Sequence, residues 1–166
     1  MKRPDCIRHW RELEGADDST YPDSTELFSI GAPLARGLRL NRLGIHHERL
    51  PPGRRTSYPH AESDEEEFIY VLDGYPEVWI NGYLWKLEPG DSVGFPAGTG
   101  ICHTFLNNTE QEVRLLVVGE ANKKFNRIYY PLNPGYAATR PDRCRRAAGR
   151  PDALLRCRPD SRPCRE

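Results

Sequence analysis

Apolar and polar residues alternate in short stretches through the middle of the chain, and turn-forming residues separate these stretches. Residues 38–43 read LRLNRL, which predicts a half-buried strand, because side chains two apart on a strand share one face. Residues 44–50 continue this strand until Pro51-Pro52-Gly53, a sequence that favours a turn. The chain is therefore expected to form strands from about Leu27 onward.

The same pattern continues to residue 130. Asn81-Gly82 is the commonest sequence of a two-residue hairpin turn, and Pro89-Gly90-Asp91 predicts another turn. We expect further strands at residues 67–72, 77–80, 83–87, 92–95, 101–106, 112–118 and 127–130. Many short strands with Gly, Pro and Asn between them, and no long helical period, predict an all-β antiparallel sandwich or barrel.

The two ends of the chain differ from this middle part. Residues 1–26 are polar, and we interpret them as an N-terminal arm with one short strand or a turn of helix. Residues 27–136 form the expected barrel domain, which is long enough for one hydrophobic core. Residues 137–166 have little to bury, so we expect a disordered, Arg-rich tail. The composition of this tail fits a genuine basic arm and a GC-rich reading frame translated out of register equally well.

Charge and cysteine content exclude several classes of protein. The chain of 166 residues has no net charge, although residues 140–166 carry nine Arg against four acidic residues. A neutral chain argues against a dedicated nucleic-acid binder. No apolar run reaches the roughly 18 residues of a membrane helix, and the first residues lack the apolar segment of a signal peptide. The five cysteines have no spacing typical of a disulfide framework or a zinc site, so we expect a cytoplasmic protein.

Candidate chemistry is concentrated between residues 59 and 74. His60 and Glu62 are two residues apart on a predicted strand and therefore project from the same face. If residues 63–66 form a turn, Glu67 begins the next strand and points toward the same place. Two carboxylates and an imidazole that converge repel one another unless a cation lies between them, so the pattern predicts a divalent metal ion.

Two motifs in the sequence resemble those of the cupin superfamily. The first cupin motif, G-x5-H-x-H-x3/4-E-x6-G, is matched by Gly53, His60, Glu62, Glu67 and Gly74. One additional residue precedes His60, and Glu62 stands where the second histidine normally stands. The spacing between Glu67 and Gly74 is kept.

The second cupin motif, G-x5-P-x-G-x2-H-x3-N, follows after residues 75–89, which is the spacing of the smallest cupins. It is matched, with two additional residues before the histidine, by Gly90, Pro96, Gly98, His103 and Asn107. The resemblance covers residues 35–120 and is strongest to small, single-domain bacterial cupins of type 2, many of them without an assigned function.

The resemblance implies a double-stranded β-helix, the jelly-roll barrel of the cupins, with a metal site inside. By resemblance, His60, Glu67 and His103 hold the metal, and Glu62 takes the position of a further ligand. A carboxylate at this position can bind the metal or stay outside its coordination sphere, and both interpretations remain open. Two imidazoles with one or two carboxylates favour Mn, Fe or Zn over Cu(I).

The resemblance also implies a small-molecule substrate inside the barrel. The first interpretation is a metal-dependent enzyme that isomerises or epimerises a sugar or sugar phosphate, with Glu62 as the catalytic proton shuttle. The second is an Fe(II) dioxygenase-type cupin, and the third is a non-catalytic module that binds a metabolite. Small cupins commonly form dimers through a sheet face or an exchanged N-terminal strand, and we expect a homodimer here.

Other polar residues have structural interpretations. His46 and His47 are neighbours on a predicted strand, so one faces inward, either as a structural residue or as part of the pocket. Cys102 adjoins His103 and points to the opposite face, which predicts a buried residue and not a ligand. Recognition of a phosphate would need an inward-facing basic residue, for which the candidates are Arg49, Arg54, Arg55, Lys86 and Arg114.

Overall fold

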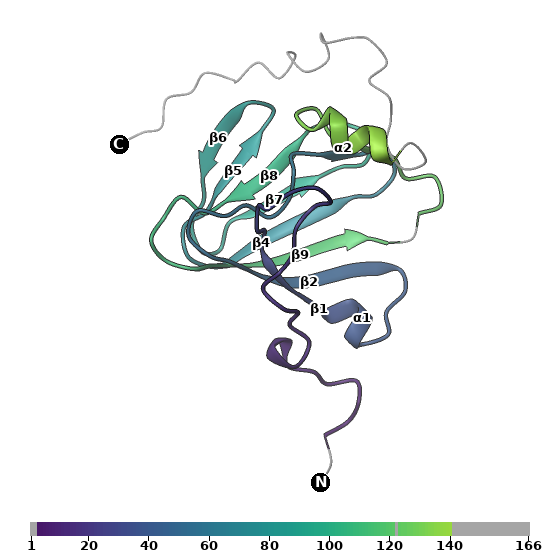
Figure 1. The fold of residues 1–166 in the computed structure, drawn as a ribbon. Helices are drawn as coiled ribbons and strands as arrows, with labels where there is room; N and C mark the ends of the chain where they lie inside the picture. Colours follow the sequence, from purple (N-terminus) through teal and green to yellow (C-terminus); the bar gives the residue numbers. More distant parts are fainter. Residues whose placement is uncertain (1–2, 122, 141–166) are drawn as a thin grey trace.

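The computed structural model describes residues 3–121 and 123–140 (Figure 1). Its strands are β1 Ile30–Pro33, β2 Leu43–Leu50, β3 Ala61–Glu62, β4 Glu67–Asp73, β5 Glu77–Ile80, β6 Tyr83–Lys86, β7 Ser92–Phe95, β8 His103–Leu106, β9 Val113–Glu120 and β10 Ile128–Tyr129. Its helical segments are the 3-10 turn η1 Trp10–Glu12 and the short helices α1 Leu34–Gly37 and α2 Pro134–Thr139. The predicted all-β class is confirmed.

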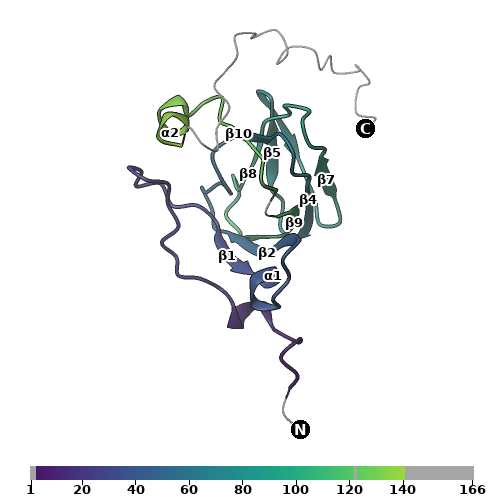
Figure 2. The same ribbon diagram turned by 90° about the vertical axis from the view of Figure 1, so that its right-hand side faces the viewer.

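Two antiparallel sheets face each other. The larger sheet has the strand order β1-β2-β9-β4-β7 and the smaller one the order β6-β5-β8, while β10 pairs with β3. Isolated bridges from Arg55 to Leu106 and from His60 to His103 attach the chain before β3 to β8. This segment therefore extends the smaller sheet, and both layers are visible side by side in Figure 2.

The core between the sheets follows from the alternation along each strand. On β4, Ile69 and Val71 are buried, whereas Phe68 and Tyr70 lie on the outer, exposed face. The other core side chains come from both sheets and are Leu50, Val78, Phe95, Phe105, Val113 and Leu115. A period of two along the sequence thus places one face of each strand in the core and leaves the other outside.

The predicted hairpin at Asn81-Gly82 is confirmed. Both residues have positive φ angles, 48° and 100°, and they connect β5 to β6. Two consecutive residues with positive φ are what a type I′ turn requires, and Asn followed by Gly adopts this conformation at low cost.

The predicted strand at residues 38–43 is wrong, because β2 begins only at Leu43. The preceding residues form α1 and a turn, in which Arg39 has a φ of 60°. Gly37 ends α1 against Leu13 so closely that a Cβ atom would lie 2.5 Å from the Leu13 Cδ1 atom. The packing of the N-terminal arm on this turn overrides the alternating pattern.

The N-terminal arm runs along one side of the sheets and reaches toward α2 (Figure 2). Trp10 in η1 stacks on His47 of β2, with ring centroids 4.2 Å apart. Further along the arm, Asp17 pairs with the guanidinium group of Arg54. The arm is therefore fixed to the barrel at several points.

A second cluster of buried side chains closes the end of the barrel near α2. Tyr21 of the arm stacks on Tyr58 at a centroid distance of 4.0 Å and meets Tyr136 of α2 edge-to-face at 4.7 Å. Phe28 and Tyr130 complete the cluster. These aromatic contacts join three segments that are far apart in the sequence.

The boundary that we expect between barrel and tail, at residue 137, falls inside α2. The rest of the expected tail, residues 141–166, lies outside the described residues. Within the part of the chain that the structure describes, no helix has the length and apolar character to cross a bilayer.

Candidate metal centre

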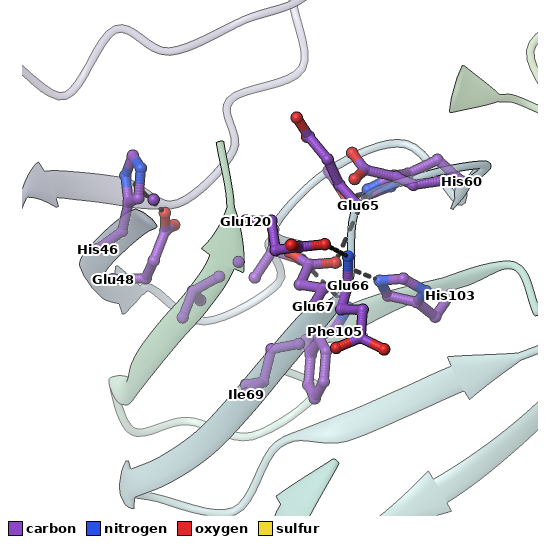
Figure 3. A pocket seen from close by; sticks show the side chains of 16 residues that line it. His46, Glu48, His60, Glu65, Glu66, Glu67, Ile69, His103, Phe105 and Glu120 are labelled. Carbon is purple, nitrogen blue, oxygen red and sulfur yellow. Dashed lines mark hydrogen bonds and ion pairs between the residues drawn. The ribbon is translucent and has the colours of Figure 1, made fainter. Parts of the chain in front are cut away.

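Three of the predicted ligands come from the ends of neighbouring strands. His60 immediately precedes β3, Glu67 is the first residue of β4, and His103 is the first residue of β8. His60 and His103 exchange both backbone hydrogen bonds, with N–O distances of 3.1 and 2.9 Å. Directly opposed residues of an antiparallel pair project from the same face, and the two rings have centroids 5.0 Å apart. Glu67 approaches them from the facing sheet (Figure 3).

The donor atoms of these three residues converge. The Nε2 atom of His103 lies 2.7 Å from the Oε2 atom of Glu67, and the Nε2 atom of His60 lies 4.0 Å from the same oxygen. One ligand atom from each residue lies within 4.8 Å of the others. We call His60, Glu67 and His103 the triad.

Backbone carbonyl groups orient both imidazoles. The Nδ1 atom of His60 is 2.9 Å from the carbonyl oxygen of Tyr58, and that of His103 is 3.2 Å from the carbonyl oxygen of Ile101. A carbonyl only accepts hydrogen bonds, so each Nδ1 carries the proton and each Nε2 is directed to the site. This arrangement is typical of histidines that bind metal through Nε2.

Burial and charge set the protonation of the triad. Burial would raise the pKa of Glu67, but the hydrogen bond with His103 and the positive charge that the neighbouring histidines carry when protonated outweigh it, so this pKa is lowered. Burial, together with the charge of His103, lowers the pKa of His60 against the opposing effect of Glu67. The carboxylate form of Glu67 and the neutral form of His60 are the forms that bind a metal.

The donor set fits a divalent transition metal. With each Nδ1 protonated, the two Nε2 atoms and the Glu67 carboxylate are all acceptors, and they are close only if a positive charge lies on or between them. A proton on His103 or a metal ion can supply this charge. Two imidazole nitrogens and one carboxylate suit Mn, Fe or Zn.

The triad lies in the wall of a cavity of about 270 Å³ between the two sheets. Besides the triad, its wall contains His46 and the hydroxyl residues Thr56 and Ser57. Six glutamates line it, and these are Glu48, Glu62, Glu65, Glu66, Glu67 and Glu120. The cavity is therefore small, polar and acidic.

A protein-family model described as the cupin domain matches residues 46–119, which contain the triad and both sequence motifs. These residues are a cupin domain. The resemblance inferred from the two motifs is thereby confirmed, and the facing sheets are the layers of the cupin barrel.

Several solved structures are similar to the chain. A cupin-superfamily sugar phosphate isomerase from Silicibacter pomeroyi is 29% identical, with a TM-score of 0.60 over 63% of this chain and 66% of that one. A provisionally assigned sugar phosphate isomerase from Acidithiobacillus ferrooxidans is 28% identical, with a TM-score of 0.59 over 62% of this chain and 65% of that one. The polyketide cyclase RemF from Streptomyces resistomycificus has the same fold at 24% identity, with a TM-score of 0.57 over 74% and 80% of the two chains.

The match spans less than two thirds of the length of both isomerases, at 65 and 66%. None of the curated proteins matches the sequence. The comparisons therefore establish the cupin domain and its fold.

Glu62 lines the cupin cavity, but among the described residues it does not belong to the group whose ligand atoms converge. Burial and the charges of Glu67 and Glu65 raise the pKa of Glu62 to about 7. Asn126 forms a hydrogen bond with Glu62 that opposes this increase. At neutral pH the side chain of Glu62 thus exists in both its acid and carboxylate forms.

Two further sequence-based predictions concern residues near the centre. His46 faces the cavity, whereas His47 lies on the outer side under Trp10, as the alternation along β2 requires. Cys102 is fully buried as predicted, and burial raises the pKa of its thiol to about 12. Its thiol is consequently inert at neutral pH.

Glu48 and Glu120 line the cavity, but they lie outside both sequence motifs. Glu48 is two residues after His46 on β2, and residues two apart on a strand share a face. This spacing indicates that Glu48 faces the cavity if His46 does. Glu120 ends β9, and the alternation of that strand does not by itself reveal which sheet it joins.

Proposed function

We propose that this cupin is a metal-dependent enzyme that acts on a small polar metabolite, with isomerisation or epimerisation of a sugar as the leading reaction. The observation that carries the proposal is the convergence of the triad in one cavity with the carboxyl group of Glu62. A metal site and an acid–base group in one cavity are the two components that such a reaction needs. The similarity to two proteins named as sugar phosphate isomerases supports the same reaction class.

In this proposal the Nε2 atoms of His60 and His103 and the carboxylate of Glu67 hold the metal, which is Mn, Fe or Zn. The metal, when bound, supplies Lewis-acid polarisation of a carbonyl or hydroxyl oxygen. The carbonyl groups of Tyr58 and Ile101 keep the two imidazoles oriented toward it. Ring stacking of Phe95 on His103, with centroids 3.4 Å apart, limits the movement of that ligand.

Glu62 moves the proton. In an aldose–ketose isomerisation, its carboxylate form removes a proton from the carbon beside the carbonyl group, and its acid form returns this proton to the former carbonyl carbon, while the hydroxyl proton moves to the former carbonyl oxygen. In an epimerisation, the carbon that lost the proton is protonated again on its opposite face. The reaction is redox-neutral and needs no second substrate. Burial raises the pKa of Glu62 above that of an ordinary carboxyl group, which favours its use as both base and acid near neutral pH.

A second candidate function is an Fe(II) dioxygenase-type cupin. The observation in its favour is that the triad consists of two histidines and one carboxylate, the donor set of many non-haem iron oxygenases. A metabolite-binding module without turnover is the remaining alternative. The identity of the bound metal and a turnover assay distinguish these functions.

Turnover by the Mn²⁺-loaded protein tests the leading proposal. We expect aldose–ketose or epimer interconversion, with deuterium incorporation at the reacting carbon in D₂O, when a panel of free and phosphorylated sugars is followed by NMR. Glu62→Gln should keep its metal and lose about 10²-fold or more in rate, because it cannot shuttle a proton. Glu110→Gln, an exposed glutamate away from the cavity, is the matched control.

Three results would change this proposal. Full activity of Glu62→Gln would remove Glu62 from the mechanism, and loss of its metal would make Glu62 a ligand. Metal-loaded protein with no turnover on any sugar would favour the binding module.

We further propose a cytoplasmic homodimer. The outer face of β4 exposes Phe68, Tyr70 and Leu72, an apolar strip that a second copy of the chain can cover. Cys6 and Cys102 are free thiols, which is consistent with a reducing compartment. A monomeric mass in sedimentation velocity at micromolar concentration would contradict the dimer.

A further inference from the structure

The wall of the cavity opposite the triad histidines is formed by β2. His46 and Glu48 project from the same face of this strand, and Figure 3 shows them together, across the cavity from His103. Neither residue belongs to the triad or to either sequence motif. This wall is therefore a second polar region of the same cavity.

Glu48 is held in place before any ligand binds. Its side chain is only 16% exposed, and the hydroxyl group of Ser29 donates a hydrogen bond to its Oε2 atom. On the other side, the Nδ1 atom of His46 lies 3.9 Å from the Oε1 atom. A carboxyl group that is fixed in this way can accept hydrogen bonds from ligand hydroxyl groups with little loss of side-chain entropy.

The cavity offers no basic side chain for an anionic ligand. Its lining, within the residues that the structure describes, contains neither Lys nor Arg. Four of the five candidates for phosphate recognition form ion pairs outside it, as Arg49–Glu14, Arg54–Asp17, Arg55–Glu26 and Arg114–Asp73. Lys86, the fifth, is on the exposed strand β6.

The charge of the lining disfavours a phosphate group. A phosphate that entered the cavity would lie among six glutamate side chains, and no Lys or Arg of the lining would compensate its charge. A metal at the triad is needed for the reacting oxygens. Hydroxyl groups, in contrast, can donate to the glutamates and accept from Thr56 and Ser57.

We propose that Glu48, positioned by Ser29, is a substrate-binding residue, and that the cavity accepts an uncharged polyhydroxylated metabolite in preference to its phosphorylated form. The inference rests on the proposed function, because it names the substrate class of the same site. The volume of about 270 Å³ suits a molecule of the size of a monosaccharide or smaller.

Calorimetric titration with matched probes tests the inference. The probes are ribose and ribose 5-phosphate, and fructose and fructose 6-phosphate, each added to Mn²⁺-loaded and to chelator-treated protein. We expect each free sugar to bind at least about tenfold more tightly than its phosphate. Glu48→Gln should weaken binding of the free sugar by about tenfold, because the amide offers one acceptor oxygen where the carboxyl group offers two. It should also reduce the preference for the free sugar over the sugar phosphate.

Ser29→Ala should have a smaller effect in the same direction, because Glu48 remains but is less well oriented. Glu110→Gln is the control and should bind both probes as the unaltered protein does. Thermal unfolding of each variant verifies that a loss of binding is not a loss of fold. A merely structural role of Glu48 would weaken both members of a pair equally and leave the preference unchanged.

The outcomes separate this inference from the proposed function. Metal-loaded protein that prefers the phosphates, shows no preference, or binds none of the probes overturns the inference and leaves the metal site intact. Protein without metal affinity that still prefers free sugars contradicts the proposed function but supports the role of Glu48.

Discussion

Burial and neighbouring charge determine the chemistry of Glu62, a residue that is one of six glutamates around the cavity. Its pKa is raised to about 7 by burial and by the charges of Glu67 and Glu65, whereas the pKa of Glu67 is lowered by the histidines beside it. Two carboxyl groups in one cavity thus have different protonation states at neutral pH. Such a separation of pKa values is typical of acid–base sites.

The pKa of Glu62 leads to a prediction about stability. A carboxyl group with an ordinary pKa of 4.5 and a folded-state pKa of about 7 binds its proton more tightly in the folded chain. The contribution of Glu62 to the free energy of unfolding of the metal-free protein therefore falls as the pH rises from 4.5 to about 7. Glu62→Gln has no carboxyl group to ionise at this position, so the variant does not lose this stability as the pH rises. We expect its free energy of unfolding at pH 8 to exceed that of the unaltered protein by about 1–2 kcal/mol, allowing for partial exposure.

Urea denaturation with a chelator, at pH 4.5 and pH 8, measures this difference. The two proteins should differ less at the lower pH, where Glu62 is largely protonated in the folded state. Glu110→Gln is the control for removal of a surface charge. An equal difference at both pH values would contradict the shifted pKa.

The residues of the centre differ in how far the sequence reveals them. The spacing of His60, Glu67 and His103 in two motifs predicts their convergence, and the structure brings them together. The role of Glu48 depends on Ser29, which is 19 residues away, and on which sheet face encloses the cavity. Neither the contact between Glu48 and Ser29 nor the sheet face that encloses the cavity can be inferred before the pairing of the strands is known.

The strands are predicted well where one face is buried and turns are marked by Gly or Asn. The pattern of β4, with Ile69 and Val71 inside, is an example. Residues 38–43 have the same kind of pattern, but a segment near the start of the chain, at Leu13, packs where the strand would begin. Local periodicity cannot report such a contact, because it depends on residues remote in the sequence.

The turn after β4 packs closely against the start of β9. Gly74 has a φ of 80°, and a Cβ atom there would lie 2.8 Å from the Cγ2 atom of Val113 and 3.0 Å from the carbonyl oxygen of Glu112. We expect Gly74→Ala to lower the free energy of unfolding by about 3 kcal/mol, from the left-handed backbone and from the clash. Gly53, with a φ of 75° and nothing within 4 Å, is the matched control.

Gly53→Ala should cost only the backbone conformation, about 1 kcal/mol. Urea denaturation of both variants measures the two values. Equal losses would show that the contact between Gly74 and β9 does not contribute to stability.

For the whole molecule, the facing sheets bring together strand ends that are distant in the chain. His60 and His103 belong to the side of the smaller sheet, and Glu67 belongs to the larger one. The barrel is thus needed to assemble the triad, and the aromatic cluster around Tyr21 and Tyr58 closes the barrel end near His60. The all-β class and the cupin domain follow from the sequence, whereas the path of the arm over the barrel does not.

The central claim is that the triad holds a divalent metal, and metal content tests it most directly. The full chain, purified without added metal and after reconstitution with Mn²⁺, Fe²⁺ or Zn²⁺, is analysed by inductively coupled plasma mass spectrometry beside Glu67→Gln, His103→Ala and the control Glu110→Gln. We predict close to one metal ion per chain in the unaltered protein and the control, and a loss of about 10-fold or more in affinity in both triad variants. A folded protein that binds no metal after reconstitution, or triad variants that retain it fully, would contradict the account.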